Sequence, residues 1–324
     1  MSRGDRRNSR KKKKSSFGRV FLPIFLTLLA VFTVGLFLID KFGISRLTDY
    51  FSGDVMSDVS PIAGGDSDFA RKYKDSKRVN VLLLGHNQEL TDTIMLGSFD
   101  TELKRVDVIS VPRDTYYERP DYPGAAHQKI NSIYKTEGVE AMAAAVSNVL
   151  CGVPIHFYDV ISDDGVARIV DAMGGVTMDV PMDMRYTDAE QGLNIDLKQG
   201  VQTLNGDQAV QFLRFRKGYP TGDLGRVEAQ QSFMKEAFKQ SMGFGFPKVA
   251  KTVVKEVDTN MKAGIAARIA GKALGMHTED IATYMAPGAA SRFNGASYYL
   301  VDEAQVDELM NAIYSMAPPE EDAG

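Results

Sequence analysis

Residues 79–111, VNVLLLGHNQELTDTIMLGSFDTELKRVDVISV, contain the segments that decide the fold. The apolar run at 79–85 ends at a glycine, which is typical of a buried strand. Two further strand-like runs, 93–99 and 105–111, are joined by the polar turn DTELK and predict a hairpin. Because a hairpin is antiparallel, it argues against an all-parallel sheet, and we expect a mixed one.

Strand patterns and helix patterns alternate along the rest of the chain. Helices are predicted at 138–150, 163–173, 205–212, 224–242, 246–257, 263–274 and 302–315, and further strands at 156–161, 175–180 and 297–301. Asn205 would cap its helix, with Gln208 placed as the partner in a capping box. This alternation predicts a layered α/β or α-β-α domain around the mixed sheet.

The first 39 residues predict a membrane anchor. Residues 1–19 hold nine lysines and arginines against one acid, and residues 20–39 (VFLPIFLTLLAVFTVGLFLI) carry no charge. About 20 apolar residues in a helix span a bilayer core. Because basic flanks stay in the cytoplasm, we expect a single-pass protein of the cell membrane, with a cytoplasmic N-terminus and an extracytoplasmic domain from residue 40 onward.

Two other interpretations of the N-terminus have less support. A cleaved signal peptide needs a small-x-small motif after its apolar core, whereas Asp40, Lys41 and Phe42 follow here. The basic run also suits nucleic acid. Its position beside the apolar segment favours a topology signal that contacts anionic lipid, so we expect membrane lipid and no nucleic acid as a partner.

The rest of the chain is acidic. The whole chain has a net charge of −4 and residues 1–19 carry +8, so the remainder carries −12. Such a domain binds polyanions poorly, and any phosphate that it recognises needs a local cluster of bases. Cys151 is the only cysteine, which excludes an intramolecular disulfide. By composition, 40–77 is an extracytoplasmic linker and 318–324 a disordered tail. The length of 78–317 allows one or two domains, and we expect one large domain there.

Four basic residues are candidates for that cluster. Arg113 follows the strand at 105–111, and strand ends are where α/β sheets usually place ligand groups. Arg214 and Arg216 point the same way if their segment is extended, and Lys129 is the fourth base. Guanidinium groups bind phosphate oxygens in a bidentate manner, so this set would suit a pyrophosphate. Ordinary surface salt bridges are the alternative, and spacing alone does not decide.

A second group shares one face of the helix predicted at 224–242. Asp223, Arg226 and Gln230 are three and four residues apart, so their side chains are neighbours on a helix. Arg226 would add another base to the same cluster.

Asp92 stands at the start of the strand at 93–99. One carboxylate together with substrate phosphates is a common way to hold Mg²⁺, although a solvated loop aspartate fits the sequence as well. The sequence has no HExxH, CxxC, GxSxG or Walker motif, so zinc-hydrolase, serine-hydrolase and P-loop activities lack support.

Seven segments resemble the LytR–CpsA–Psr family when they are taken together. In chain order they are NVLLLGHN, LTDTIML, ISVPRDT, KINSIY, DAMGGVTMDVP, LNGDQAVQFLRFRK and GDLGRVEAQQ. The resemblance covers about residues 79–242 and continues more loosely to the C-terminus. It implies an α-β-α sandwich with an apolar pocket for a polyprenyl chain. It also implies transfer of a teichoic-acid or capsular-type glycopolymer from a polyprenyl diphosphate carrier to peptidoglycan, with release of polyprenyl phosphate, and a possible prenyl pyrophosphatase activity.

Carried over by position, the resemblance implies roles for individual residues. Asp92 and Asn87 would hold Mg²⁺ or Mn²⁺. The pyrophosphate would be bound by Arg113, Lys129, Arg214, Arg216, Arg226 and Gln230, and the catalytic residues would be Arg113, Asp223 and Arg226. Either Asp223 or Asp114 could be the general base, and the sequence does not choose between them.

Two positions depart from the family pattern. Asn87 stands where the family often has Asp, and Leu90 where it often has Arg. An amide offers oxygen but no charge, so we expect weaker or more hydrated Mg²⁺ binding. The missing Arg removes one charge-assisted contact of roughly 1.5–3 kcal/mol. Because the other bases could still hold the ligand, we expect an active variant subgroup of the family.

Two other classes of function compete with an enzyme. A non-catalytic polyprenyl-pyrophosphate-binding or regulatory envelope protein stays open, because of Asn87 and Leu90. A transcription regulator would need a folded DNA-reading module on the cytoplasmic side, and 19 residues without a hydrophobic pattern cannot form one.

Overall fold

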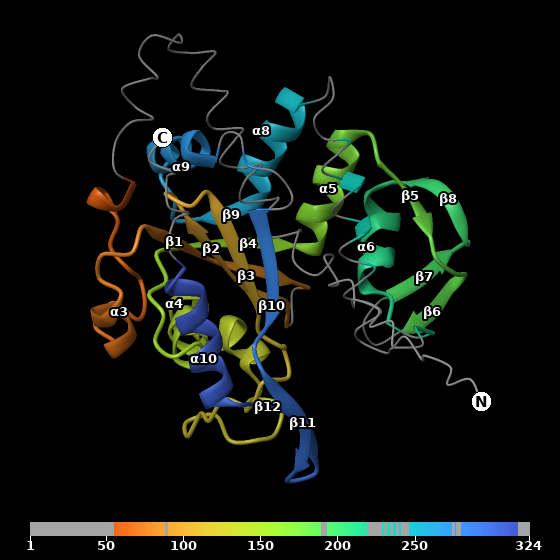
Figure 1. The fold of residues 1–324 in the computed structure, drawn as a ribbon. Coiled ribbons are helices and arrows are strands. Elements are labelled where there is room, and N and C mark those ends of the chain that lie inside the picture. Colours follow the sequence, from red (N-terminus) through yellow and green to blue (C-terminus); the bar gives the residue numbers. More distant parts are fainter. Residues whose placement is uncertain are drawn as a thin grey trace, which may run out of the picture.

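The computed structural model describes residues 55–87, 90–188, 193–216, 218–219, 229, 232–233, 236–237, 240, 246–273, 276 and 280–316. Its centre is a six-stranded sheet in the order β10-β3-β2-β1-β4-β9 (Figure 1). The strands are β1 (Arg78–His86), β2 (Thr91–Asp100), β3 (Arg105–Ser110), β4 (Phe157–Ser162), β9 (Val257–Thr259) and β10 (Ile281–Met285). β1 pairs antiparallel with β2 and parallel with β4, which confirms the predicted mixed sheet.

The predicted hairpin is formed by β2 and β3, which pair antiparallel with Leu96 opposite Ile109. The apolar run that begins this region is β1. Its alternate residues point to opposite faces: Leu82 and Leu84 enter one core, while Val81 and Leu83 enter another. Because both faces are buried, residues 81–84 in the middle of the strand are all apolar and do not alternate.

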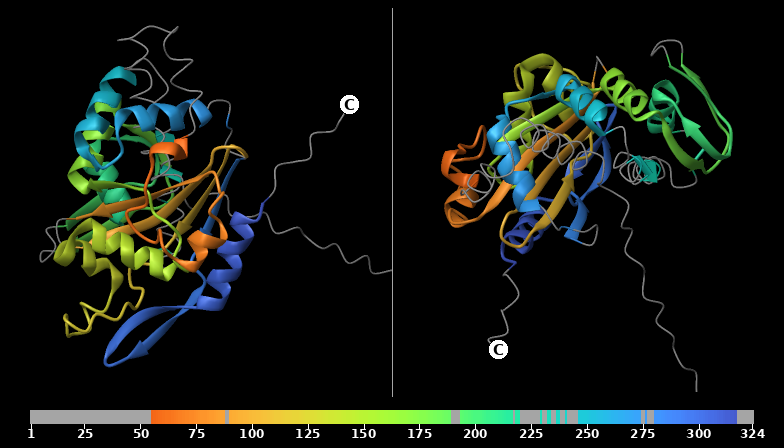
Figure 2. Two further views of the ribbon diagram at one scale, coloured as in Figure 1. Left: turned by 90° about the vertical axis from the view of Figure 1, so that its left-hand side faces the viewer. Right: turned by 90° about the horizontal axis from the view of Figure 1, so that it is seen from above.

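Helices cover both faces of the sheet (Figure 2). One core packs the sheet against α3, α4 and α10, with Phe69, Met142 and Met310 buried in it. On the other face, Val55 of η2 and Ile265 of α9 are buried against the sheet. The result is the expected α-β-α layering. The elements are η2 (Val55–Asp58), α3 (Asp68–Lys72), η3 (Ile130–Ser132), α4 (Ile133–Val149), α9 (Ala263–Ala273) and α10 (Glu303–Tyr314).

A lateral unit lies beside the sandwich, at the right of Figure 1, and has its own core. It contains α5 (Asp163–Met173), α6 (Gly206–Arg214), α8 (Phe246–Glu256), β5 (Val176–Val180), β6 (Met184–Asp188), β7 (Leu193–Leu197) and β8 (Gly200–Leu204). β5 pairs with β8 and β6 with β7. Ile161 of β4 and Val257 of β9 join the same core, so the unit is packed directly on the edge of the main sheet.

Two consecutive glycines make the turn from α5 into β5. Gly174 ends the helix in the left-handed conformation, with φ of 85°. Gly175 has φ of 94°, and a Cβ there would lie 2.9 Å from the carbonyl oxygen of Leu204. Glycine therefore allows β5 to approach β8 closely enough to pair.

The last strands form the hairpin of β11 (Gly288–Phe293) and β12 (Ala296–Val301), which extends from the sandwich (Figure 1). Its backbone is tied to the loop after β3, because Thr115 and Tyr299 form a parallel bridge. The N–H of Tyr116 also donates to the carbonyl of Tyr299 at 2.9 Å.

Residues 55–77 belong to the fold, although their composition predicted part of a linker. Val55 and Phe69 are 1% and 5% exposed, and the N–H of Ile62 donates to the carbonyl of Ile155 at 2.7 Å. Small polar residues surround these few apolar anchors, which is why composition did not indicate them. Residues 55–77 are therefore part of the folded domain.

Several predicted segments lie outside the described residues. They are the tail at 1–19, the membrane helix at 20–39, most of the helix at 224–242 and the tail at 318–324. Within the ranges that the structure describes, no helix is both long and apolar enough to cross a membrane.

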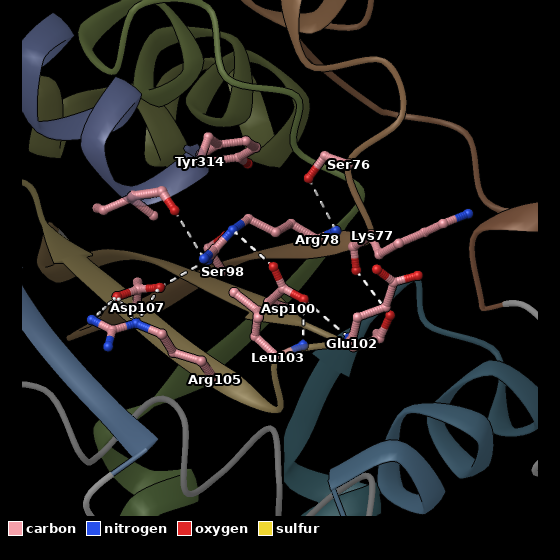
Figure 3. A network of polar contacts seen from close by, with 12 residues as sticks. Ser76, Lys77, Arg78, Ser98, Asp100, Glu102, Leu103, Arg105, Asp107 and Tyr314 are labelled. Atoms are coloured by element: carbon pink, nitrogen blue, oxygen red, sulfur yellow. Dashed lines mark hydrogen bonds and ion pairs between the residues drawn. The ribbon is translucent and has the colours of Figure 1, made fainter. Parts of the chain in front are cut away.

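A buried ionic network ties α10 to the beginning of β1 (Figure 3). The Nη1 of Arg78 donates to Asp107 at 2.8 Å and to Ser98 at 3.3 Å, and its Nη2 donates to the carbonyl of Ile313 at 3.0 Å. Arg78 and Asp107 are 2% and 0% exposed, and Arg105 is a second cation on Asp107. This network lies at the end of the sheet where β1 begins.

Candidate functional site

The opposite end of the sheet collects the polar side chains singled out in the sequence. β1 and β4 are parallel, and β3 runs in the same direction because both β1 and β3 are antiparallel to β2. Their carboxyl ends therefore meet at one edge, beside the start of β2. In α/β sheets, ligands bind at this edge. We call it the carboxyl edge.

Asp92, near the start of β2, is the centre of the contacts at the carboxyl edge. Its Oδ1 accepts hydrogen bonds from Nη1 of Arg113 and, at 3.1 Å, from Nη2 of Arg216. Its Oδ2 accepts from Nδ2 of Asn87 at 2.8 Å. Asp92 therefore holds residues that follow β1, β3 and α6. A carboxylate shared by two guanidinium groups fixes both of them in place.

Arg214 and Arg216 lie on either side of Phe215, where α6 ends. Phe215 has an extended backbone (φ −65°, ψ 129°) and is 2% exposed in the core of the lateral unit. The arginines on either side of it reach carboxylates at the carboxyl edge. The Nε of Arg214 lies 3.7 Å from Oδ2 of Asp163, and Arg216 contacts Asp92. The spacing of two thus sends both arginines toward the same site.

Lys129 joins the same group through Asp114. Its Nζ donates to Oδ1 of Asp114 at 2.8 Å, and Oδ2 of Asp114 lies 3.9 Å from Nε of Arg113. The loop after β3 folds back to make this contact, because Tyr116 forms an antiparallel bridge with Lys129. Both oxygens of Asp114 face cations, so Asp114 is better suited to hold these bases than to accept a proton.

Asp163 belongs to the site but was not singled out in the sequence. It is the first residue of α5, directly after β4, and its side chain is 34% exposed. Burial raises the pKa of the Asp163 carboxyl to about 6; the Arg214 guanidinium lowers it, and the charges of Asp92 and Asp164 raise it. Its position at the end of a strand was the available signal. Aspartate at a helix start is so common as a capping residue that the sequence did not separate the two roles.

The predicted site residues that the structure describes all lie at this edge. They are Asn87, Asp92, Arg113, Lys129, Arg214 and Arg216. Each of the four bases makes an ion pair, as it would if these residues formed ordinary surface salt bridges. The ion pairs are gathered in one cluster from five parts of the chain, which scattered surface pairs would not be.

The remaining predicted residues have other outcomes. Asp223, Arg226 and Gln230 lie outside the described residues. The apolar side chains of Met142, Val146 and Ile169, in α4 and α5, are 0–3% exposed.

At the carboxyl edge, the described residues can supply only part of the coordination of a metal ion. Within the described ranges, no group of three or more His, Cys, Asp or Glu side chains could hold a metal. Asp92 offers one carboxylate that is 22% exposed. Asn87 turns its amide nitrogen toward Asp92, and its Oδ1 accepts from the N–H of Leu90 at 3.1 Å. One carboxylate suits Mg²⁺ when substrate phosphates and water supply the other oxygens.

Comparison with known proteins identifies the family. Residues 55–314 match the model of the LytR_cpsA_psr family. The chain belongs to this family. The match begins at residue 55, where the described fold also begins.

Individual relatives agree with this assignment. The chain is 27% identical, over 97% of its length and 98% of the relative, to the polyisoprenyl-teichoic acid–peptidoglycan teichoic acid transferase TagU of Oceanobacillus iheyensis. It is 32% identical to the regulatory protein MsrR of Staphylococcus aureus, over 60% of this chain and 59% of that protein.

The fold is also that of a solved family member. B. subtilis TagV superposes with a TM-score of 0.60 at 23% identity, covering 74% of this chain and 98% of TagV.

Proposed function

We propose that the protein is an extracytoplasmic phosphotransferase that moves a glycopolymer from a polyprenyl diphosphate carrier to peptidoglycan. The observation that carries the proposal is the convergence of Arg113, Lys129, Arg214 and Arg216 at the carboxyl edge of a family-typical fold. The name of the Oceanobacillus relative supports teichoic acid as the glycopolymer, because that relative matches along nearly its whole length.

The clustered bases suit the chemistry of this transfer. A hydroxyl of peptidoglycan attacks the phosphorus that carries the glycan. A new oxygen–phosphorus bond forms, the bond to the bridging oxygen breaks, and polyprenyl phosphate leaves with the electron pair. Phosphoryl transfer depends mainly on positioning and on neutralising the charge of the equatorial and leaving oxygens. One carboxylate oxygen of Asp92 holds both Arg113 and Arg216. Their two guanidinium groups therefore already lie side by side, where a pyrophosphate can accept hydrogen bonds from both.

Mg²⁺ or Mn²⁺ is part of the proposal. Asp92, oriented by the hydrogen bond from Asn87, would hold the ion together with phosphate oxygens. When bound, the ion supplies positive charge against the phosphate that leaves. Because Asn87 presents an amide nitrogen to Asp92, the site has one anionic protein ligand among the described residues, and we propose a low affinity for the free cation.

We also propose that residues 20–39 anchor the protein in the cell membrane, with residues 1–19 in the cytoplasm. The support is the uncharged run of 20 residues after a strongly basic segment. An anchor would keep the carboxyl edge in the same bilayer region as a polyprenyl-linked substrate, which raises the local concentration of the substrate.

The experiment that tests the function uses the full chain in detergent micelles. Farnesyl diphosphate and Mg²⁺ are supplied, with water as the acceptor, and the release of phosphate is measured. We expect turnover that requires Mg²⁺. A second arm adds lipid-linked teichoic acid and peptidoglycan, and transfer is read as polymer that becomes attached to the peptidoglycan. If farnesyl diphosphate binds but neither arm turns over, the enzyme assignment is wrong.

A second candidate function is a non-catalytic lipid-carrier binder or regulator. Asn87 and Leu90 favour it, because each removes a charge where the family pattern often has one. The relative MsrR carries the word regulatory in its name. The same experiment separates the two functions, since a binder retains farnesyl diphosphate and releases no phosphate.

A further inference from the structure

The carboxylates of Asp92, Asp114 and Asp163 lie at the carboxyl edge. They differ in the hydrogen bonds and ion pairs that they make within the described part of the chain. Asp92 accepts three hydrogen bonds, and both oxygens of Asp114 face cations. Asp163 makes one ion pair within the described residues, with Nε of Arg214 at 3.7 Å, which is too long for a hydrogen bond. Its Oδ2 is buried and has no hydrogen-bond partner there.

Asp163 is also not needed to cap α5. The hydroxyl of Ser162 accepts from the N–H of Gly165 at 3.0 Å, so the residue before Asp163 already caps the helix. A buried oxygen without a partner lowers stability, and such groups are retained mainly where they have another role. Because Oδ2 is buried while the side chain is 34% exposed, Oδ1 is the oxygen that a substrate hydroxyl could reach.

Charged groups on α6, β2 and α5 act on Asp163. Burial has the largest effect and raises the pKa of the Asp163 carboxyl. Arg214 of α6 lowers it, and the charges of Asp92 of β2 and Asp164 of α5 raise it. The resulting pKa is about 6. On α8, which also packs against α5, Glu256 is engaged with Arg168 at 2.7 Å. The carboxyl is therefore ionised at neutral pH and still basic enough to take a proton, which is the condition for an efficient general base.

We propose that Asp163 is the general base of the transfer reaction, a role that rests on the proposed function. As the acceptor hydroxyl forms its bond to phosphorus, its proton passes to the carboxylate of Asp163. The bond from phosphorus to the bridging oxygen breaks, and the leaving phosphate takes that electron pair. With farnesyl diphosphate as the probe, water is the acceptor and loses its proton in the same way.

The test compares the full-length Asp163→Asn variant with the parent protein, in detergent with Mg²⁺ and farnesyl diphosphate. Asparagine keeps the shape of the side chain and removes the proton acceptor. We expect kcat to fall by about 10²- to 10⁴-fold, the range for one general base, with the KM and the Kd for farnesyl diphosphate within threefold of the parent. The exposed neighbour Asp164 gives the matched control, and Asp164→Asn should keep the parent kcat.

The pH profile is the second measurement, and it needs no variant. In the parent, kcat should fall below a pKa near 6 as Asp163 becomes protonated. A parent profile without this limb overturns the role of Asp163 even if the variant does not fold. A kcat for Asp163→Asn within threefold of the parent also overturns it. Loss of farnesyl diphosphate binding in Asp163→Asn overturns it too and makes Asp163 an anchor for Arg214. A parent without any turnover refutes the proposed function itself, whereas an active parent confines the failure to Asp163.

Discussion

Arg216 donates a hydrogen bond to Asp92 at 3.1 Å, although 124 residues separate the two in the chain. The contact joins the segment after α6 to the start of β2, so it links the lateral unit to the main sheet. The same oxygen of Asp92 accepts from Arg113. A ligand with several anionic oxygens can engage both arginines where Asp92 now does, and this makes the pair the first target for substitution.

Replacing Arg113 or Arg216 by alanine should weaken turnover of prenyl diphosphate. Each change removes a charge-assisted contact of roughly 1.5–3 kcal/mol, which corresponds to about 10- to 150-fold in kcat/KM. Steady-state kinetics with farnesyl diphosphate measure the effect. Arg185→Ala is the matched control, because Arg185 is 64% exposed in the lateral unit and pairs with Asp196. If either site variant is as active as Arg185→Ala, that arginine does not contact the pyrophosphate.

Asp92→Asn should separate metal binding from anion binding. The change removes the carboxylate proposed to share Mg²⁺, so the Mg²⁺ concentration for half-maximal activity should rise at least tenfold. It also removes a negative charge beside Arg113 and Arg216, so farnesyl diphosphate should bind without Mg²⁺ at least as tightly as in the parent. Activity titrated with Mg²⁺, and calorimetry in EDTA, give the two readings. An unchanged Mg²⁺ requirement would remove Asp92 from the metal site.

Most of the main sheet and its helices could be predicted from local patterns. β1 includes the largely apolar run at 79–85 that predicted it, and α5 spans the predicted 163–173. The capping box of Asn205 and Gln208 forms as expected. These patterns are local, so they can be recognised in the sequence without knowledge of the tertiary contacts.

The predictions failed where structure depends on distant partners. β9 has three residues and exists because it pairs with β4. β7 carries a local strand signal, the alternation of buried Leu193, Ile195 and Leu197, although no strand is predicted there. In the region assigned to a linker, Val55 and Phe69 are single apolar anchors among small polar residues.

The candidate site was predictable in part for the same reason. Arg113 and Asp92 were identifiable as strand-end residues with suitable chemistry. Their meeting with Arg216 depends on the order of strands in the sheet, which the sequence does not state. Asp163 was missed because its role follows from β4 lying parallel to β1, so that both end at the same edge.

Arg78→Ala should destabilise the fold and leave the chemistry of the carboxyl edge intact. Breaking a buried ion pair costs about 3–5 kcal/mol, and we expect the lower value because Arg105 still faces Asp107. Urea unfolding at neutral pH measures the loss. The exposed pair of Arg185 and Asp196 provides the comparison, since Arg185→Ala should cost less than about 1 kcal/mol. Equal losses in the two variants would show that the network of Figure 3 contributes no more than a surface pair.

His156 should make the fold less stable in mild acid. It is 4% exposed, and its Nδ1 accepts from the N–H of Asn80 at 3.0 Å. Burial lowers the pKa of His156 from 6.5 to about 4. Between these two values the unfolded chain binds a proton that the folded protein does not, so the stability falls as the pH drops from about 6.5 toward 4. The total loss is roughly 3 kcal/mol, because each pKa unit corresponds to about 1.4 kcal/mol.

Urea unfolding of the parent and of His156→Gln at pH 7, 6 and 5 isolates this contribution. Glutamine does not titrate, so the variant should lose less stability than the parent over the same interval, whatever its stability at pH 7. The carboxyl groups titrate in both proteins and cancel in the comparison. Parallel slopes for the parent and His156→Gln would mean that His156 takes up its proton without unfolding, and the buried imidazole would then have to be accessible to water in the native state.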